Sequence, residues 1–149
     1  MDVDLVCELT ENKVTPFVGR FTKDFYISET AIREAVRRKS CFNLVHLPTS
    51  FKVDIFVSRG RPFDLEAMRR ANLEVLGDTS SVSVPIATVE DSIVSKLKWF
   101  RLTNETSERQ WNDVSRLIRL SGETADLCYL RKAADSVGVR DLLERLLSD

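Results

Sequence analysis

The sequence predicts an α+β fold in which a mixed β-sheet with flanking helices comes first and a helical half follows. Up to about residue 87, short runs rich in β-branched and aromatic residues alternate with brief helical patterns. From Thr88 onward, apolar residues recur only at helical spacing. We therefore expect an α/β core over residues 1–87 and a helical C-terminal region over residues 88–149 that packs on this core.

Four strands and two helices are expected in the first part of the core. The strands are residues 2–8, 25–27, 42–47 and 51–57, each rich in apolar or aromatic residues. A helix over residues 14–21 is limited at its start by Pro16, and a second helix begins at Ser28 or Thr30 and ends in the basic run 37–39. Pro48-Thr49-Ser50 separates the last two strands, which predicts an antiparallel hairpin with Asp54 on a central or near-central strand.

The rest of the chain is expected to be mostly helical. Asp64 is the expected cap of a short helix, and two strands, residues 73–76 and 82–86, are bounded by the turn Gly77-Asp78. Thr88 with Asp91, and Ser107 with Gln110, have the spacing of a capping box, and each pair precedes a helical apolar stripe. Two further helices end the chain, the first around Leu127 to Ala134 and the second around Asp141 to Leu147.

Length, charge and cysteine usage narrow the class of protein. The chain has 149 residues, which is enough for one domain with a substantial core. Its 22 Lys and Arg nearly balance its 23 Asp and Glu, so no overall field draws it to nucleic acid or to a membrane surface. Three cysteines without CxxC spacing indicate reduced thiols and favour the cytoplasm. No apolar run approaches the roughly 20 residues that span a bilayer, so we expect no membrane partner.

Three aspartates lie on apolar strands and indicate metal chemistry. Asp54 is in the middle of Phe51–Val57, and the period of two places Asp2 and Asp4 on one face of the first strand. A carboxylate on an apolar strand needs a cationic partner, either a metal ion or a basic side chain. If the two strands are neighbours, three carboxylates converge and can hold two divalent cations about 3.5–4 Å apart. Oxygen ligands of this kind suit Mg²⁺ or Mn²⁺.

Each of these aspartates also has a simpler interpretation. Asp2 and Asp4 can be solvated residues of a frayed terminus. Asp54 can form an ion pair on a polar sheet face with one of three basic neighbours, Lys52, Arg59 or Arg61. Both interpretations stay open at the level of sequence.

Several motifs resemble those of the nucleotidyltransferase superfamily. Asp2-Val3-Asp4-Leu5 resembles its paired-aspartate element, and Lys52-Val53-Asp54-Ile55-Phe56 resembles its later third-aspartate element. The segments 89–91, 96–101 and 107–114 are similar to those of small prokaryotic nucleotidyltransferase-like proteins related to the toxins of abortive-infection systems. The resemblance covers nearly the whole chain and implies a nucleotidyltransferase-like mixed sheet.

The resemblance also implies an activity and a set of site residues. The reaction would transfer a nucleoside monophosphate from a nucleoside triphosphate to a hydroxyl of an unidentified acceptor, RNA or protein. Asp2, Asp4 and Asp54 would bind Mg²⁺ or Mn²⁺ in a two-metal site, and Asp54 would also help to deprotonate the acceptor. The nucleotide would be contacted by Lys96 and Arg109, and Asp113 would orient Lys96 or a basic neighbour. A homodimer or an antitoxin is the protein partner that the resemblance suggests.

The chain departs from the superfamily at one motif. The Gly-Ser loop that cradles the triphosphate normally lies shortly before the paired aspartates, and here only Met1 precedes Asp2. We expect an enzyme that is truncated or has a misassigned start. The alternative is a catalytically inactive module of the same fold that acts through protein–protein contact.

Overall fold

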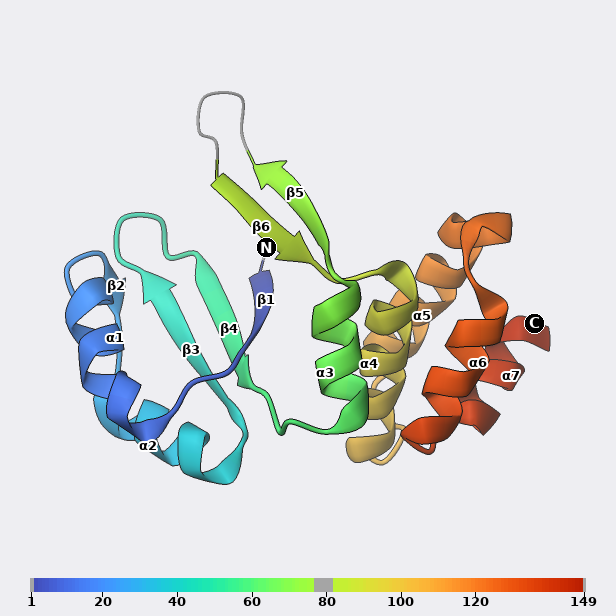
Figure 1. Cartoon of the computed structure of the whole chain (residues 1–149), viewed down its shortest axis with the longest axis horizontal. Coiled ribbons are helices and arrows are strands. Elements are labelled where there is room, and N and C mark those ends of the chain that lie inside the picture. Colours follow the sequence, from blue (N-terminus) through green and yellow to red (C-terminus); the bar gives the residue numbers. More distant parts are fainter. Residues whose placement is uncertain (1, 77–81, 149) are drawn as a thin grey trace. The chain divides into compact units, whose positions relative to one another are not determined.

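The computed structural model describes residues 2–76 and 82–148, without the side chains of Asp2, Leu76 and Glu123. The expected α+β fold is confirmed. Within the described residues there are seven α-helices, a mixed sheet of four strands and a separate sheet of two strands (Figure 1). The chain divides into two compact units, Met1–Arg61 and Pro62–Asp149.

This division lies earlier in the chain than the expected one after residue 87. Helix α3 (Pro62–Arg70) belongs to the second unit because Phe63 is buried in the helical core, together with Ile93 and Leu97. Within the residues that the structure describes, strands β5 (Asn72–Leu76) and β6 (Val82–Ile86) form a separate two-stranded sheet. The four strands β1 to β4 of the larger sheet therefore lie within the first unit.

The sheet of the first unit has the strand order β1-β4-β3-β2. Its strands are β1 (Asp2–Cys7), β2 (Phe25–Tyr26), β3 (Cys41–His46) and β4 (Lys52–Val57). The expected hairpin is confirmed, since β3 and β4 are antiparallel, whereas β1 joins the other edge of β4 as a parallel neighbour. Asp54 therefore lies on an interior strand.

Two helices cover one face of this sheet. After the short 3₁₀ turn η1 (Glu11–Lys13) come α1 (Val14–Phe21) and α2 (Glu29–Arg38), and α2 begins where the Ser28 hydroxyl accepts a hydrogen bond from the Ala31 N–H. Val14 and Ile32 from this layer are buried against strand residues that include Leu44 and Ile55. The period of two turns the intervening strand residues toward the opposite face.

The second unit is a helical bundle with a β-hairpin between α3 and the next helix. Thr88 and Ser107 cap α4 (Val89–Leu102) and α5 (Glu108–Ser121) as expected, each accepting a hydrogen bond from the residue three positions on. The remaining elements are the 3₁₀ turn η2 (Gly122–Thr124), α6 (Leu127–Ser136) and α7 (Arg140–Ser148). Fully buried aliphatic residues from α4 to α7 form the core: Ile93, Val94, Leu97, Val114, Leu130, Leu142 and Leu143.

Two details around α3 and the hairpin bear on the sequence-based expectations. Asp64 lies inside the first turn of α3 and does not cap it, because Pro62 already occupies the first helical position. The strands on either side of the expected turn are present, but Gly77-Asp78 itself lies outside the described residues.

Among the helices that the structure describes, none is long and apolar enough to cross a membrane.

Candidate functional site

A row of polar side chains crosses three strands of the first unit. In the parallel pair, Asp4 of β1 is the register partner of Asp54 on β4, and Asp54 is in turn the partner of Asn43 on β3. Register partners share a face and neighbouring strands lie about 4.8 Å apart, so Asp4 and Asp54 are close enough to ligate one cation. The condition under which the carboxylates converge, that the two strands are neighbours, therefore holds for Asp4 and Asp54.

The local sequence explains why this row faces away from α1 and α2. Ile55 is 5% exposed in the core under the helices and Val53 packs against the same core, so Asp54 between them points to the other face. The Asp54 side chain keeps 20% of its surface exposed, and Asp4 is exposed on the edge strand. Asp54 is thus held between two aliphatic neighbours that pack on the core, while Asp4 and Asp54 both stay accessible to water.

Lys52 provides a cationic partner for Asp54. It lies two residues earlier on β4 and so shares the face of Asp54, and its Nζ donates to Asp54 Oδ2 at 2.9 Å. The next row of the sheet places Asp2 opposite Lys52 in the β1–β4 register. Arg59, another basic candidate, instead donates from Nε to the Lys39 carbonyl. The ion pair that the sequence left open for Asp54 is therefore formed with Lys52.

The donor chemistry of the row suits a hard divalent cation. Asp4 and Asp54 offer carboxylate oxygens, and Asn43 offers an amide oxygen beside Asp54. Mg²⁺ and Mn²⁺ prefer such oxygens and keep several waters when only one or two carboxylates bind them. Within the described side chains, no three His, Cys, Asp or Glu lie close enough together to hold a metal. The side chain of Asp2, the expected third carboxylate, is outside that description, so the two-metal arrangement stays a prediction.

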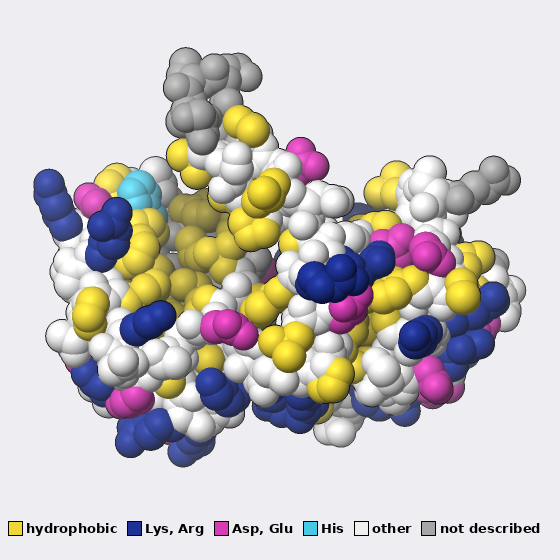
Figure 2. Space-filling view, in the orientation of Figure 1, with side chains coloured by type: hydrophobic (Ala, Val, Ile, Leu, Met, Phe, Trp, Pro, Cys, Tyr) yellow, Lys and Arg dark blue, Asp and Glu magenta, His cyan; other side chains and the backbone are white. Residues whose placement is uncertain are grey.

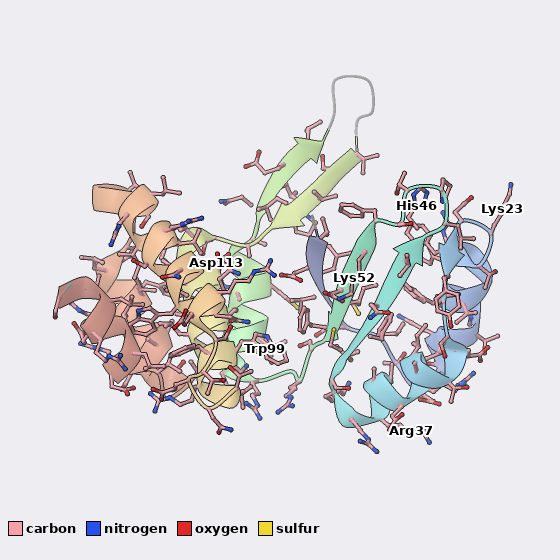
Figure 3. All side chains as sticks on the ribbon, turned by 180° about the vertical axis from the view of Figure 1, so that it is seen from behind. Lys23, Arg37, His46, Lys52, Trp99 and Asp113 are labelled. Atoms are coloured by element: carbon pink, nitrogen blue, oxygen red, sulfur yellow. The ribbon has the colours of Figure 1, made fainter. Side chains whose placement is uncertain are left out.

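The other expected site residues lie on α4 and α5 of the second unit. Lys96 Nζ is 3.6 Å from Asp113 Oδ2, and both side chains are about one-third exposed. Figure 3 shows Asp113 on the helical unit and Lys52 on the sheet of the first unit. Arg109 lies in the first turn of α5 and is exposed. The structure thus brings Lys96 and Asp113 together, and the contact of Lys96 and Arg109 with a nucleotide stays a prediction.

Sequence reasoning missed a buried polar network in the second unit. Asp91 is only 1% exposed and accepts hydrogen bonds from Arg70 Nε at 3.3 Å, Thr88 Oγ1 at 2.8 Å and Tyr129 Oη at 2.6 Å. The Arg70 guanidinium lies 3.6 Å from the centre of the Tyr129 ring. Arg70 belongs to α3, Asp91 to α4 and Tyr129 to α6, so the network links three helices of the second unit.

Two pKa shifts follow from this network. Burial, and then the hydrogen bond to the Asp91 carboxylate, raise the pKa of the Tyr129 hydroxyl, so it stays a donor at neutral pH. For Glu90, burial favours the neutral acid, but the Asp126 N–H at 2.9 Å, other hydrogen bonds and Arg70 outweigh it and lower its pKa. Both acids of the network are thus held by cations and donors, which indicates a structural role. The adjacent acids Glu90 and Asp91, shortly after Thr88, were the one feature of the sequence that could have indicated this network.

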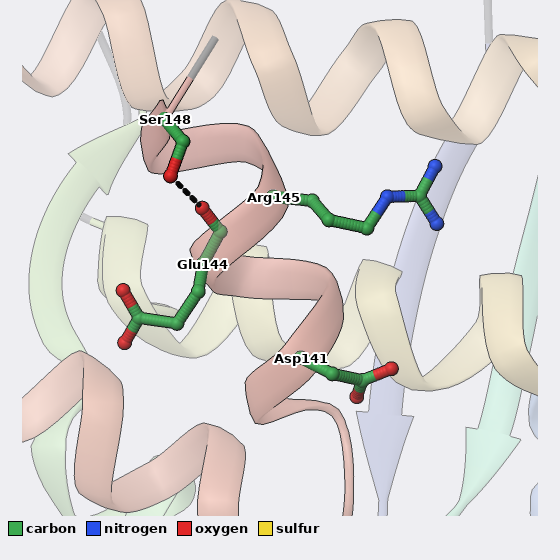
Figure 4. A pocket seen from close by; sticks show the side chains of 4 residues that line it. All are labelled: Asp141, Glu144, Arg145 and Ser148. Atoms are coloured by element: carbon green, nitrogen blue, oxygen red, sulfur yellow. Dashed lines mark hydrogen bonds between the residues drawn. The ribbon is translucent and has the colours of Figure 1, made fainter.

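A surface hollow on α7 is not a second candidate. It measures about 480 Å³ and is lined by four residues of this one helix, Asp141, Glu144, Arg145 and Ser148 (Figure 4). Its carboxylates already have partners, because Asp141 accepts from Arg101 and Glu144 accepts from Arg131 and Arg140. The polar row on the first unit remains the candidate site.

Comparison with protein-family models finds no match to this sequence, and a search of curated proteins finds none either. The motifs and the strand register therefore carry the functional argument.

Proposed function

We propose that the chain is a metal-dependent nucleotidyltransferase, which transfers a nucleoside monophosphate from a nucleoside triphosphate to an acceptor hydroxyl. One observation carries the proposal: Asp4 lies opposite Asp54 on neighbouring parallel strands, and these are two of the three aspartates in the motifs that resemble the superfamily. Two carboxylates on one open sheet face are a costly arrangement without cations, since like charges across a strand pair repel. A nucleotide–metal complex would supply those cations.

The roles of the residues follow from their positions. Asp4 and Asp54 would hold the cation from two strands whose spacing is fixed by the sheet. Asp2, two residues before Asp4 on β1, would be the third carboxylate ligand. When bound, Mg²⁺ or Mn²⁺ neutralises charge on the triphosphate and activates the attacking oxygen. Asp54, on the interior strand, is the residue that we expect to take the proton of the acceptor hydroxyl.

Metal binding with and without the Asp54 carboxylate tests this proposal. We expect Mn²⁺, titrated calorimetrically with a non-hydrolysable triphosphate, to bind the wild type and to bind Asp54→Asn at least about tenfold more weakly, because one anionic ligand is lost. Asp24→Asn is the matched control, since Asp24 is exposed in the same unit. Far-UV circular dichroism checks that each variant is folded. Equal Mn²⁺ affinity in the wild type and Asp54→Asn would remove the proposal.

A second candidate function is a catalytically silent module that acts through protein contact, as a homodimer or with an antitoxin. Two observations favour it. Lys52 already neutralises Asp54 without a metal, and the β5–β6 hairpin exposes apolar side chains, with Leu73 at 74% and Val75 at 64%. Figure 2 shows such apolar side chains on the hairpin surface. Light scattering of the full chain tests this candidate, and a monomer at every concentration would count against the homodimer.

A further inference from the structure

The position of Lys52 places a cation beside the row of Asp4 and Asp54. Its Nζ is 2.9 Å from Asp54 Oδ2, and its register partner on β1 is Asp2, the first aspartate of the paired motif. On the shared face, Lys52 therefore lies in the row of Asp2, next to the row of Asp4 and Asp54. The ammonium thus contacts Asp54, one of the carboxylates that the proposed function assigns to a metal.

An ammonium and a divalent cation cannot share the same face of one carboxylate oxygen. Mg²⁺ binds oxygen ligands at about 2.0–2.1 Å, which puts it closer to Asp54 Oδ2 than the lysine nitrogen now is. Two cations at that separation repel each other strongly and compete for the same lone pairs. Lys52 can move away, since it has a flexible four-carbon stem and 43% of its side chain is exposed.

We propose that Lys52 is the built-in counter-cation of the carboxylate row: it pairs with Asp54 in the metal-free protein and is displaced when a divalent cation binds. This inference rests on the proposed function, because it concerns the same site. Lys52 is then a positioning residue, which acts on the metal through Asp54. It neutralises Asp54 while no metal is bound, at the cost of weaker metal binding.

The inference predicts that removing the ammonium tightens metal binding. An ordinary surface ion pair would leave the metal affinity unchanged when it is broken, and a lysine that orients Asp54 for the metal would leave it weaker. An ammonium that repels the metal and competes with it for Asp54 makes the affinity rise when it is removed. The direction of the change therefore separates these three roles of Lys52.

Mn²⁺ alone is the probe, measured by electron paramagnetic resonance titration of the full chain without nucleotide. We expect Lys52→Met to lower the Mn²⁺ dissociation constant about fivefold or more, because the competing cation is gone. Lys52→Arg retains a cation and should stay within about twofold of the wild type. Lys23→Met is the matched control, since Lys23 is exposed and lies on the far side of the same unit from Lys52 (Figure 3).

The double variant Lys52→Met with Asp54→Asn ties the effect to the ion pair. We expect it to lose the gain in affinity, because the carboxylate for which the ammonium and the metal compete is absent. If the wild type binds Mn²⁺ and Lys52→Met binds it equally or more weakly, the inference fails while the proposed function stands. If neither protein binds Mn²⁺, both fail. Binding by Lys52→Met alone, dependent on Asp54, supports the inference.

Discussion

Replacing Tyr129 with Phe tests the buried network of the second unit. The substitution removes one hydroxyl and keeps the ring over which the Arg70 guanidinium lies at 3.6 Å. Only the hydrogen bond from Tyr129 Oη to Asp91 Oδ1, 2.6 Å long, is lost. Thr88 and Arg70 contact the other carboxylate oxygen, Oδ2, so they do not replace the missing donor.

The expected loss of stability is large for a single oxygen atom. A hydrogen bond to a charged group contributes about 1.5–3 kcal/mol, and a buried charged oxygen without its donor adds a desolvation penalty. Asp91 is 1% exposed, so water cannot supply that donor without a rearrangement of the helices. We therefore expect the free energy of unfolding of the second unit to fall by about 2–3 kcal/mol.

Urea unfolding followed by tryptophan fluorescence measures this loss. Both tryptophans, Trp99 and Trp111, belong to the second unit, so the signal reports the unit that contains the network. The only other tyrosine, Tyr26, is 67% exposed, and Tyr26→Phe is the matched control, with an expected change within about 0.5 kcal/mol. If Tyr129→Phe unfolds at the same urea concentration as the wild type and Tyr26→Phe, the network is not a stabilising one.

Three further predictions follow from named contacts. Glu90 has a lowered pKa in the folded chain, so its stabilisation is present above the unfolded pKa of about 4.3 and is lost as the pH falls through the folded value; Glu90→Gln should lose less stability than the wild type between pH 7 and pH 3 in urea titrations. Cys128 is exposed, whereas burial raises the pKa of the Cys7 and Cys41 thiols, so Cys128→Ser should remove the one fast phase of labelling by a disulfide reagent at pH 8; three equal rates would contradict this. Lys96→Met should weaken binding of a fluorescent triphosphate about tenfold while the exposed Lys132→Met does not, and equal losses in both would remove the role of Lys96.

Local sequence patterns were sufficient for most of the elements. Capping by Ser28, Thr88 and Ser107 depends on residues three positions apart, and the sequence shows such spacings directly. The alternation in Phe51–Val57 likewise placed Asp54 on the face opposite the core. Short-range periodicity and capping chemistry therefore predict where helices and strands occur and which way their residues point.

Contacts between distant residues could not be obtained in the same way. The parallel pairing of β1 with β4 brings together residues 50 positions apart, and only the resemblance to known motifs suggested that Asp4 and Asp54 are neighbours. No motif suggested that Arg70 and Tyr129 meet at Asp91, because the three residues come from three separate helices. The sequence also offered several basic residues as ion-pair partners of Asp54. The geometry of β4 shows that the partner is Lys52.

The proposed nucleotidyltransferase activity requires a divalent cation between Asp4 of β1 and Asp54 of β4. Paramagnetic broadening of backbone amide signals by Mn²⁺, recorded on the ¹⁵N-labelled chain, locates the ion directly. We expect the first signals to disappear to be those of residues beside Asp4, Asp54 and Asn43, with the amides of α1 and α2 on the covered face broadened later. Broadening that begins at any other acidic surface, or that is the same throughout the chain, would contradict the claim.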